Sequence, residues 1–232
     1  MSKSFRQPFT LFTNEIPPFV IKGKNTVLLI QDFHNYFSNT KEGVLFKISD
    51  ELYLNQELEE YKKLLLITKN NIIEILKGVR NFDNINILYT CLGYFENEKL
   101  SIFLKTLGWN LLLEKENLFE NKIKPHQNDL IFSKGYWSAL TNLSFVKYLK
   151  NNKIENVIIC GNILEYGIIN TTFDLMNMGI KTLIVSDAVT SLTYQANNFT
   201  KGSIAHGLIK LRSTGETLEL INNINANNQV KL

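Results

Sequence analysis

Short apolar runs rich in β-branched residues alternate along the chain with longer amphipathic stretches. The runs have the length of strands, and they predict strands at Thr26–Gln31, Asn86–Thr90, Asp129–Phe132, Asn156–Cys160 and Thr182–Ser186. This alternation is typical of βα units, in which the strands form a buried parallel sheet and the helices cover its faces. The sequence therefore predicts an α/β protein.

The stretches between these runs carry leucines and isoleucines at helical spacing. They predict one or two helices within Ser49–Arg80, then single helices at Ser138–Lys150, Tyr166–Met178 and Gln195–Arg212. Gly179 directly follows the third of these segments, as a glycine often does after the last helical turn.

The two ends of the chain are predicted to add little to this core. Thr217–Ile221 is expected to form an edge strand, and the Asn-rich tail at about residues 222–232 is expected to fray. An N-terminal arm is expected over about residues 1–24. Since no repeat or linker interrupts the pattern, residues 1–232 are predicted to form a single domain.

Composition narrows the class of protein. With 232 residues and 44% hydrophobic side chains the chain can bury a sizeable core, and its net charge of +3 is too mild for a nucleic-acid binder. The start MSKSFRQPFTLFT lacks the continuous apolar stretch of a signal peptide, and no apolar run has the length of a bilayer span. Cys91 and Cys160 suit reduced thiols. We therefore expect a cytoplasmic protein with no nucleic-acid or membrane partner.

Polar residues at the ends of the predicted strands are the candidates for chemistry, because ligands bind beyond the carboxyl ends of parallel strands. Asp32 follows the run VLLIQ, and Lys134 comes shortly after DLIF. A lysine close to Asp32 would orient an anionic group or keep the carboxylate ionised. The plainer alternatives are that Asp32 caps the following turn and that Lys134 is a solvated surface lysine.

Three segments, taken together in their order and spacing, resemble the isochorismatase-like, or cysteine hydrolase, family. They are TVLLIQDFHNYF around Asp32, FSKGYWSAL around Lys134, and the block at residues 157–191 that contains Gly161 and Gly167. The resemblance spans roughly residues 20–215. It implies a three-layer, Rossmann-like fold with a mostly parallel six-stranded sheet, and a homodimer or larger homo-oligomer.

The resemblance also implies a reaction. The amidases of this family use an Asp–Lys–Cys triad, but Gly167 stands in the position of the cysteine, so a thioester cannot form there. Isochorismatases, some of them in siderophore pathways, also have glycine at this position. They cleave an enol ether without a covalent intermediate, as the aspartate protonates the vinyl carbon and water then releases pyruvate. We therefore expect a hydrolase of specialised biosynthesis, with Asp32 as the general acid and Lys134 as a carboxylate ligand.

The substrate pocket is expected to differ from that of isochorismatases. Leu92 stands where they have a glutamine, Ile163 and Glu165 stand where they have an aromatic residue and a histidine, and Tyr136 replaces an arginine. These changes remove groups that would bind a dicarboxylate, so a related small acid is the alternative substrate. The predicted substrate-binding residues are these four together with Phe37, Trp137, Tyr166 and Gly167.

Two other functions are open at this level. The chain could be a family member that has lost catalysis and serves as a binding or scaffold subunit, or, more remotely, an amidase that uses Cys91 as its nucleophile. No cofactor is expected. Asp32 and His34 have an Asp-x-His spacing, but one such pair without other histidines nearby in the sequence does not indicate a zinc site.

Overall fold

The structure is a computed structural model that describes residues 19–21, 23–39, 43, 55–82, 84–93, 101–106, 118–204 and 209–229. Most of the expected N-terminal arm, the start of the predicted helix at Ser49, and the residues Tyr94 and His206 lie outside these ranges. The elements follow one another as η1 Gly23–Asn25, β1 Thr26–Gln31, α2 Asn35–Ser38, α4 Asn55–Arg80, β2 Asn86–Leu92, α5 Ile102–Thr106, β3 Leu130–Lys134, η2 Ala139–Thr141, α6 Leu143–Asn151, β4 Asn156–Gly161, η3 Leu164–Ile168, α7 Ile169–Asn177, β5 Lys181–Val189, α8 Tyr194–Ile204, β6 Ile209–Arg212 and α9 Thr214–Gln229.

The six strands form one sheet in the order β3-β2-β1-β4-β5-β6, and every neighbouring pair is parallel. This confirms the predicted α/β architecture with a six-stranded sheet. The order runs outward in both directions from the centre of the sheet, where β1 lies between β2 and β4. All carboxyl ends lie at one edge, so the residue after β1 and the last residues of β2, β3 and β4 are neighbours there.

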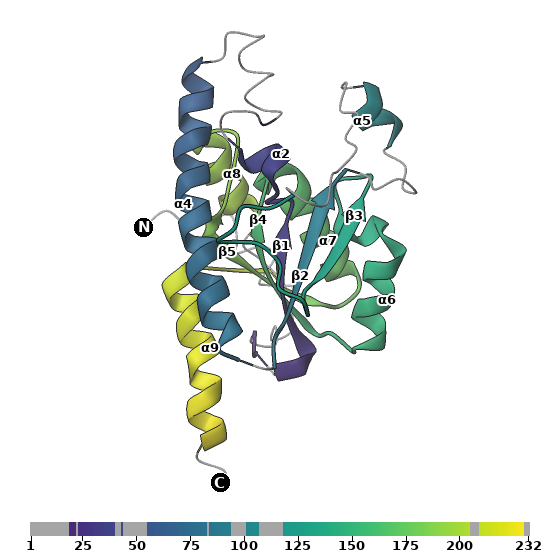
Figure 1. Cartoon of the computed structure of the whole chain (residues 1–232), viewed down its shortest axis with the longest axis vertical. Helices are drawn as coiled ribbons and strands as arrows, with labels where there is room; N and C mark the ends of the chain where they lie inside the picture. Colours follow the sequence, from purple (N-terminus) through teal and green to yellow (C-terminus); the bar gives the residue numbers. More distant parts are fainter. Residues whose placement is uncertain are drawn as a thin grey trace, which may run out of the picture.

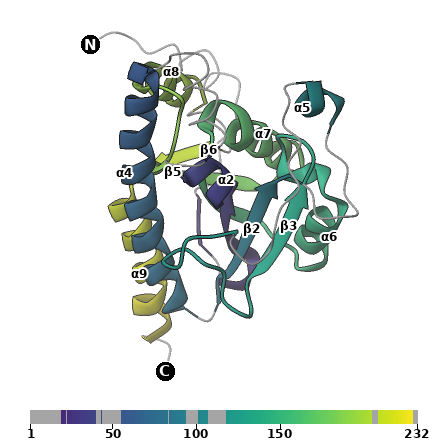
Figure 2. The same cartoon turned by 45° about the horizontal axis from the view of Figure 1, so that its top comes forward.

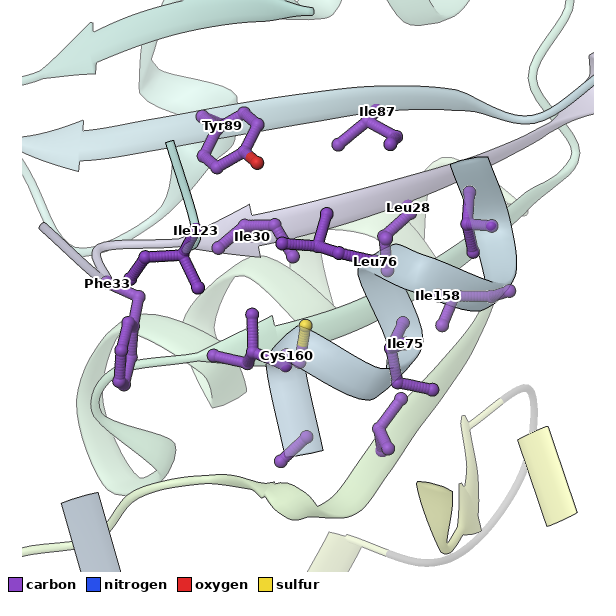
Figure 3. Close-up of a cluster of buried hydrophobic side chains, with 14 of the residues drawn as sticks. Leu28, Ile30, Phe33, Ile75, Leu76, Ile87, Tyr89, Ile123, Ile158 and Cys160 are labelled. Atoms are coloured by element: carbon purple, nitrogen blue, oxygen red, sulfur yellow. The ribbon is translucent and has the colours of Figure 1, made fainter. Parts of the chain in front are cut away.

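Helices cover both faces of the sheet (Figures 1 and 2). On one face, the long helix α4 packs against β5 and lies side by side with α9. The helices α6 and α7 cover the opposite face. Side chains alternate between two buried clusters along each strand: Leu28 and Ile30 face α4, whereas Val27 and Leu29 face α6 and α7. Figure 3 shows the first of these clusters, with side chains of β1, β2 and β4 against Ile75 and Leu76 of α4.

The strands β1 to β5 were each predicted to within three residues at either end, and β1 was predicted with its observed bounds. The C-terminal part was predicted wrongly. The segment predicted as one helix over Gln195–Arg212 holds the helix α8, which ends at Ile204, and the edge strand β6. The predicted edge strand Thr217–Ile221 lies inside the helix α9.

The physical reason lies in the burial pattern of α9. Thr214, Thr217 and Ile221 are buried at the spacing of a helix, whereas the alternation of leucine and polar residues in TLELI resembles a strand. Asp187 Oδ1 accepts hydrogen bonds from the backbone N–H and the hydroxyl of Thr214 at 2.8 Å each, and this fixes the start of the helix. The tail expected to fray from residue 222 is therefore helical to Gln229. Within the described residues, no helix is both long and apolar enough to cross a bilayer.

Candidate active site

Asp32 directly follows the central strand β1 and has a left-handed conformation, with φ of +53°. If the strand continued, its alternation would direct residue 32 toward α4, as it does Leu28 and Ile30. The positive φ, which aspartate tolerates better than most residues, ends the strand instead. The carboxylate Oδ2 lies 2.6 Å from Nζ of Lys134, and the Asp32 side chain is only 4% exposed.

Lys134 is the last residue of β3, and its fully buried side chain reaches across the end of β2 to Asp32. Its ammonium donates three hydrogen bonds: to Asp32 Oδ2, to the Tyr136 carbonyl at 3.1 Å and to the Trp137 carbonyl at 2.8 Å. An ammonium has three protons, so all are engaged. Lys134 is therefore not the solvated surface lysine of the plainer alternative, and its hydrogen bonds hold and orient Asp32.

Burial dominates the electrostatics of this pair. Loss of solvation raises the pKa of Asp32 to about 6, against the lowering effects of the Lys134 charge and hydrogen bond, the Leu92 backbone and the Gln31 amide. Burial likewise lowers the pKa of Lys134, and the Asp32 carboxylate counters it. The raised pKa of Asp32 favours its protonated form despite the lysine neighbour, and the protonated form is the one that a role as an acid requires.

Gly167 lies in the π-helical turn η3, between β4 and α7, rather than at the opening of α7. A Cβ on this residue would lie 2.6 Å from Gln31 Nε2, 3.1 Å from Asp32 Oδ2 and 3.2 Å from the Asn162 carbonyl. A side chain at this position would thus point at the Gln31 amide and the Asp32 carboxylate. Position 167 has no room for one while the Gln31 amide stays where it is.

The sequence did not single out Gln31 as a site residue. It is the last residue of β1 and is fully buried, and its Nε2 donates to the Trp137 carbonyl at 3.4 Å. A glutamine at the end of an otherwise apolar run, next to a candidate aspartate, was the available signal. Gly161, with φ of +127°, lets β4 come close to it, because a Cβ there would overlap the Gln31 carbonyl.

Two of the predicted substrate-binding aromatic residues come together beside Asp32 and Lys134. Trp137 and Tyr166 stack with ring centroids 5.0 Å apart and an interplanar angle of 26°. Tyr166 is 40% exposed and Tyr136 52% exposed, whereas Trp137 is half-buried. This aromatic pair borders the site from two elements, because the Trp137 carbonyl binds Lys134 and Tyr166 directly precedes Gly167.

The other predicted pocket residues have packing contacts of their own. Leu92 is fully buried at the end of β2, between β1 and β3, and its carbonyl faces His34 Nε2 at 3.2 Å. Phe37 is 3% exposed and packs against the His34 ring with centroids 5.2 Å apart. Ile163 is 4% exposed and follows Asn162 through a cis peptide bond.

Glu165 is half-buried, and its Oε1 accepts the Leu192 backbone N–H at 2.8 Å. One carboxylate oxygen of this predicted substrate-binding residue therefore anchors the loop after β5. Asn162, which sequence reasoning missed, accepts a hydrogen bond from the Thr190 hydroxyl and donates to the Tyr61 hydroxyl at 3.3 Å. These bonds tie the loop that carries Gly167 to α4 and β5.

The candidates His34, Cys91 and Cys160 form no hydrogen bond or ion pair with Asp32 or Lys134 that the structure shows among the described residues. Burial lowers the pKa of His34 to about 3, so its ring is neutral, and no group of three or more metal-binding side chains occurs among the described residues. Cys91 and Cys160 are fully buried, and burial raises the pKa of both thiols. A protonated, inaccessible Cys91 is unsuited to act as a nucleophile.

Comparison with known proteins places this geometry in a family. The model of the isochorismatase domain matches residues 89–215, which is more than half of the chain. The chain belongs to the isochorismatase family. This family is hydrolytic, and the match confirms the relationship inferred from the motifs.

Solved structures show the isochorismatase fold over most of the chain. A cysteine hydrolase from Pseudomonas syringae pv. phaseolicola 1448A is similar with a TM-score of 0.74 and 15% identity, over 91% of this chain and 99% of that one. An isochorismatase-like hydrolase from Alkaliphilus metalliredigens has a TM-score of 0.63 and 16% identity over 84% and 97%. The N-carbamoylsarcosine amidase of Thermoplasma acidophilum has a TM-score of 0.60 and 15% identity over 82% and 96%.

Proposed function

We propose that this member of the isochorismatase family hydrolyses an enol ether of isochorismate, or of a related small acid, without a covalent thioester. The observation that carries the proposal is a buried aspartate with a pKa of about 6 that faces a glycine. Such an aspartate can donate a proton to carbon near neutral pH, whereas a glycine offers no nucleophile. The reaction that fits these two residues is acid cleavage by water.

In this proposal Asp32 is the general acid and protonates the terminal vinyl carbon. Lys134 keeps the carboxyl group in position, since its three protons hold Asp32 Oδ2 and two backbone carbonyls within 3.1 Å. The stacked pair Trp137 and Tyr166 offers an aromatic surface beside the acid, which suits a cyclic substrate. We place the reaction in specialised biosynthesis.

The second candidate, a subunit that binds but does not catalyse, is favoured by one observation. The side chains of Asp32 and Lys134 are 4% and 0% exposed, so the acid pair is almost closed to solvent. A buried ion pair of this kind is also compatible with a purely structural role. The residues Leu92, Glu165 and Tyr136, which stand where isochorismatases have a glutamine, a histidine and an arginine, point the same way.

Product analysis separates these functions. The purified protein is incubated with isochorismate, and pyruvate is followed by oxidation of NADH through lactate dehydrogenase. Nicotinamide and N-carbamoylsarcosine are tested in parallel for release of ammonia. We expect pyruvate and no ammonia. Release of ammonia would instead support an amidase, and no turnover of isochorismate or its close analogues would support the binding subunit.

A further inference from the structure

Three buried oxygen atoms at the carboxyl ends of β1 and β2 have no hydrogen-bond partner within the described part of the chain. They are Gln31 Oε1, Asp32 Oδ1 and Thr90 Oγ1. Gln31 and Thr90 are fully inaccessible, and Asp32 is 3% exposed. An unsatisfied buried polar group destabilises the folded protein, and proteins commonly satisfy such groups with an ordered water.

The orientation of the Gln31 amide follows from its neighbours. Its nitrogen faces two acceptors, the Trp137 carbonyl at 3.4 Å and the Asp32 carboxylate, whose pKa its hydrogen bond lowers. Turning the amide over would set Oε1 against both of these oxygens. Nε2 therefore faces the Trp137 carbonyl and the Asp32 carboxylate, and Oε1 is the acceptor without a partner among the described residues.

The register of the sheet brings Thr90 to the same place. Gln31 and Thr90 are partners across the parallel pair of β1 and β2, and the Asp32 backbone N–H donates to the Thr90 carbonyl at 2.8 Å. Both side chains lie on the face that Leu29 and Leu88 cover, since each is two residues further along its strand. The three unsatisfied oxygens thus belong to adjacent positions of the sheet, next to Gly167.

We infer that Gln31 and Thr90, together with Asp32, bind the water molecule that attacks the substrate. A water has two protons to donate and lone pairs to accept, so one molecule satisfies all three groups. It donates to Gln31 Oε1 and accepts from the Thr90 hydroxyl, and it donates its second proton to Asp32 Oδ1 once Asp32 has given its own proton to the substrate. The inference rests on the proposed function and names the groups that position its second reactant.

The reaction balances with these groups alone. Asp32 gives its proton to the terminal enol carbon and leaves an oxocarbenium ion and a carboxylate. The oxygen of the bound water forms a bond to the cationic carbon, and one proton of that water returns to Asp32. The resulting hemiketal loses the alcohol as the carbon–oxygen bond breaks and the hydroxyl proton passes to the leaving oxygen, which yields pyruvate. Gln31 and Thr90 transfer no proton, so they are positioning residues.

The test uses isochorismate in D2O with the wild type and the variants Gln31→Leu and Thr90→Val. If water is held poorly, the oxocarbenium ion returns to substrate before capture, and deuterium from Asp32 remains on the enol carbon of recovered isochorismate. We expect pyruvate release to fall by about 10- to 100-fold, since positioning errors have effects of this order. Mass spectrometry of the recovered substrate should show deuterium in both variants and none in the wild type.

Two further variants serve as controls. Thr90→Ser keeps the hydroxyl and should restore pyruvate release without exchange. Thr182→Val removes a fully buried hydroxyl that also has no partner within the described residues, but Thr182 lies at the amino end of β5 and should leave both readouts unchanged.

The outcomes separate this inference from the proposed function. If the wild type releases pyruvate but Gln31→Leu and Thr90→Val release it at the wild-type rate, or more slowly without deuterium in the substrate, the water-positioning role is overturned and the proposed function stands. If the wild type releases no pyruvate from isochorismate or its close analogues, both are overturned. Slower release together with deuterium exchange supports both.

Discussion

Adding one methyl group at position 167 tests whether the site depends on the absence of a side chain there. In Gly167→Ala the new Cβ would lie 2.6 Å from Gln31 Nε2, a distance that real Cβ atoms do not tolerate. It would also lie 3.1 Å from Asp32 Oδ2 and 3.2 Å from the Asn162 carbonyl. Gln31 is fully buried, so its amide can move only by displacing its neighbours.

The expected cost follows from this overlap. Adding a methyl group to a packed interior destabilises a protein by about 1–3 kcal/mol, and moving Gln31 also breaks its hydrogen bonds to Asp32 and the Trp137 carbonyl. We therefore expect Gly167→Ala to lower the free energy of unfolding by about 2 kcal/mol or more and to reduce pyruvate release. The matched control is Gly202→Ala in α8, where a Cβ would meet nothing within 4 Å. That change should be neutral or stabilise the helix by up to about 1 kcal/mol.

Urea denaturation followed by circular dichroism measures both variants and the double variant Gln31→Ala/Gly167→Ala. If the cost arises from contact with Gln31, the double variant should be more stable than the sum of the two single effects predicts, because residues in contact are not additive. The account of position 167 is refuted if Gly167→Ala and Gly202→Ala have the same free energy of unfolding.

Three further predictions concern the acid pair and the thiols. The proposed mechanism requires the protonated form of Asp32, whose pKa is about 6. The value of kcat/KM for isochorismate should therefore be level below pH 6 and fall about tenfold per pH unit above it; a profile flat from pH 5 to 8 would contradict this. Asp32→Asn leaves the Lys134 ammonium buried without its carboxylate, so urea denaturation should show a free energy of unfolding lower by about 3–5 kcal/mol. The double variant Asp32→Asn/Lys134→Met should regain most of that stability. Equal free energies of unfolding for the two variants would argue against a stabilising ion pair. Because Cys91 and Cys160 are buried, mass spectrometry should find neither thiol modified after native protein is treated with iodoacetamide, and pyruvate release should be unchanged. Loss of activity on labelling of Cys91 would instead support a covalent mechanism.

The central part of this fold follows from the sequence because its strands are fully buried. Runs such as Val27–Ile30 and Val157–Cys160 are apolar throughout, which is how buried parallel strands differ from amphipathic helices. Their carboxyl ends must lie at one edge of the sheet, so Asp32 and Lys134 were expected to be neighbours. The 2.6 Å contact between them agrees with that expectation.

The C-terminal elements do not follow in this way, because they lie at the edge of the sheet and over α4. β6 has only four residues, too few for a period to be recognised, and Thr217–Ile221 fits a strand or a helix equally well. Only the buried neighbours and the cap from Asp187 decide between them.

The roles of individual side chains were the hardest to predict. No spacing in the sequence reveals that Lys134 uses its three protons within the protein, that Gln31 lies against Gly167, or that burial exceeds the effect of Lys134 on the pKa of Asp32. These properties depend on distances across the sheet and on loss of solvent, which only the folded structure defines.

The rate at which Asp32→Asn releases pyruvate from isochorismate at pH 6, compared with the wild type, tests the central claim most directly. Asparagine keeps the shape of the side chain but has no proton to give to the vinyl carbon. The account predicts that release falls by at least about 10²-fold, the usual effect of removing a general acid. A rate within twofold of the wild type would show that Asp32 is not the acid and would contradict the account.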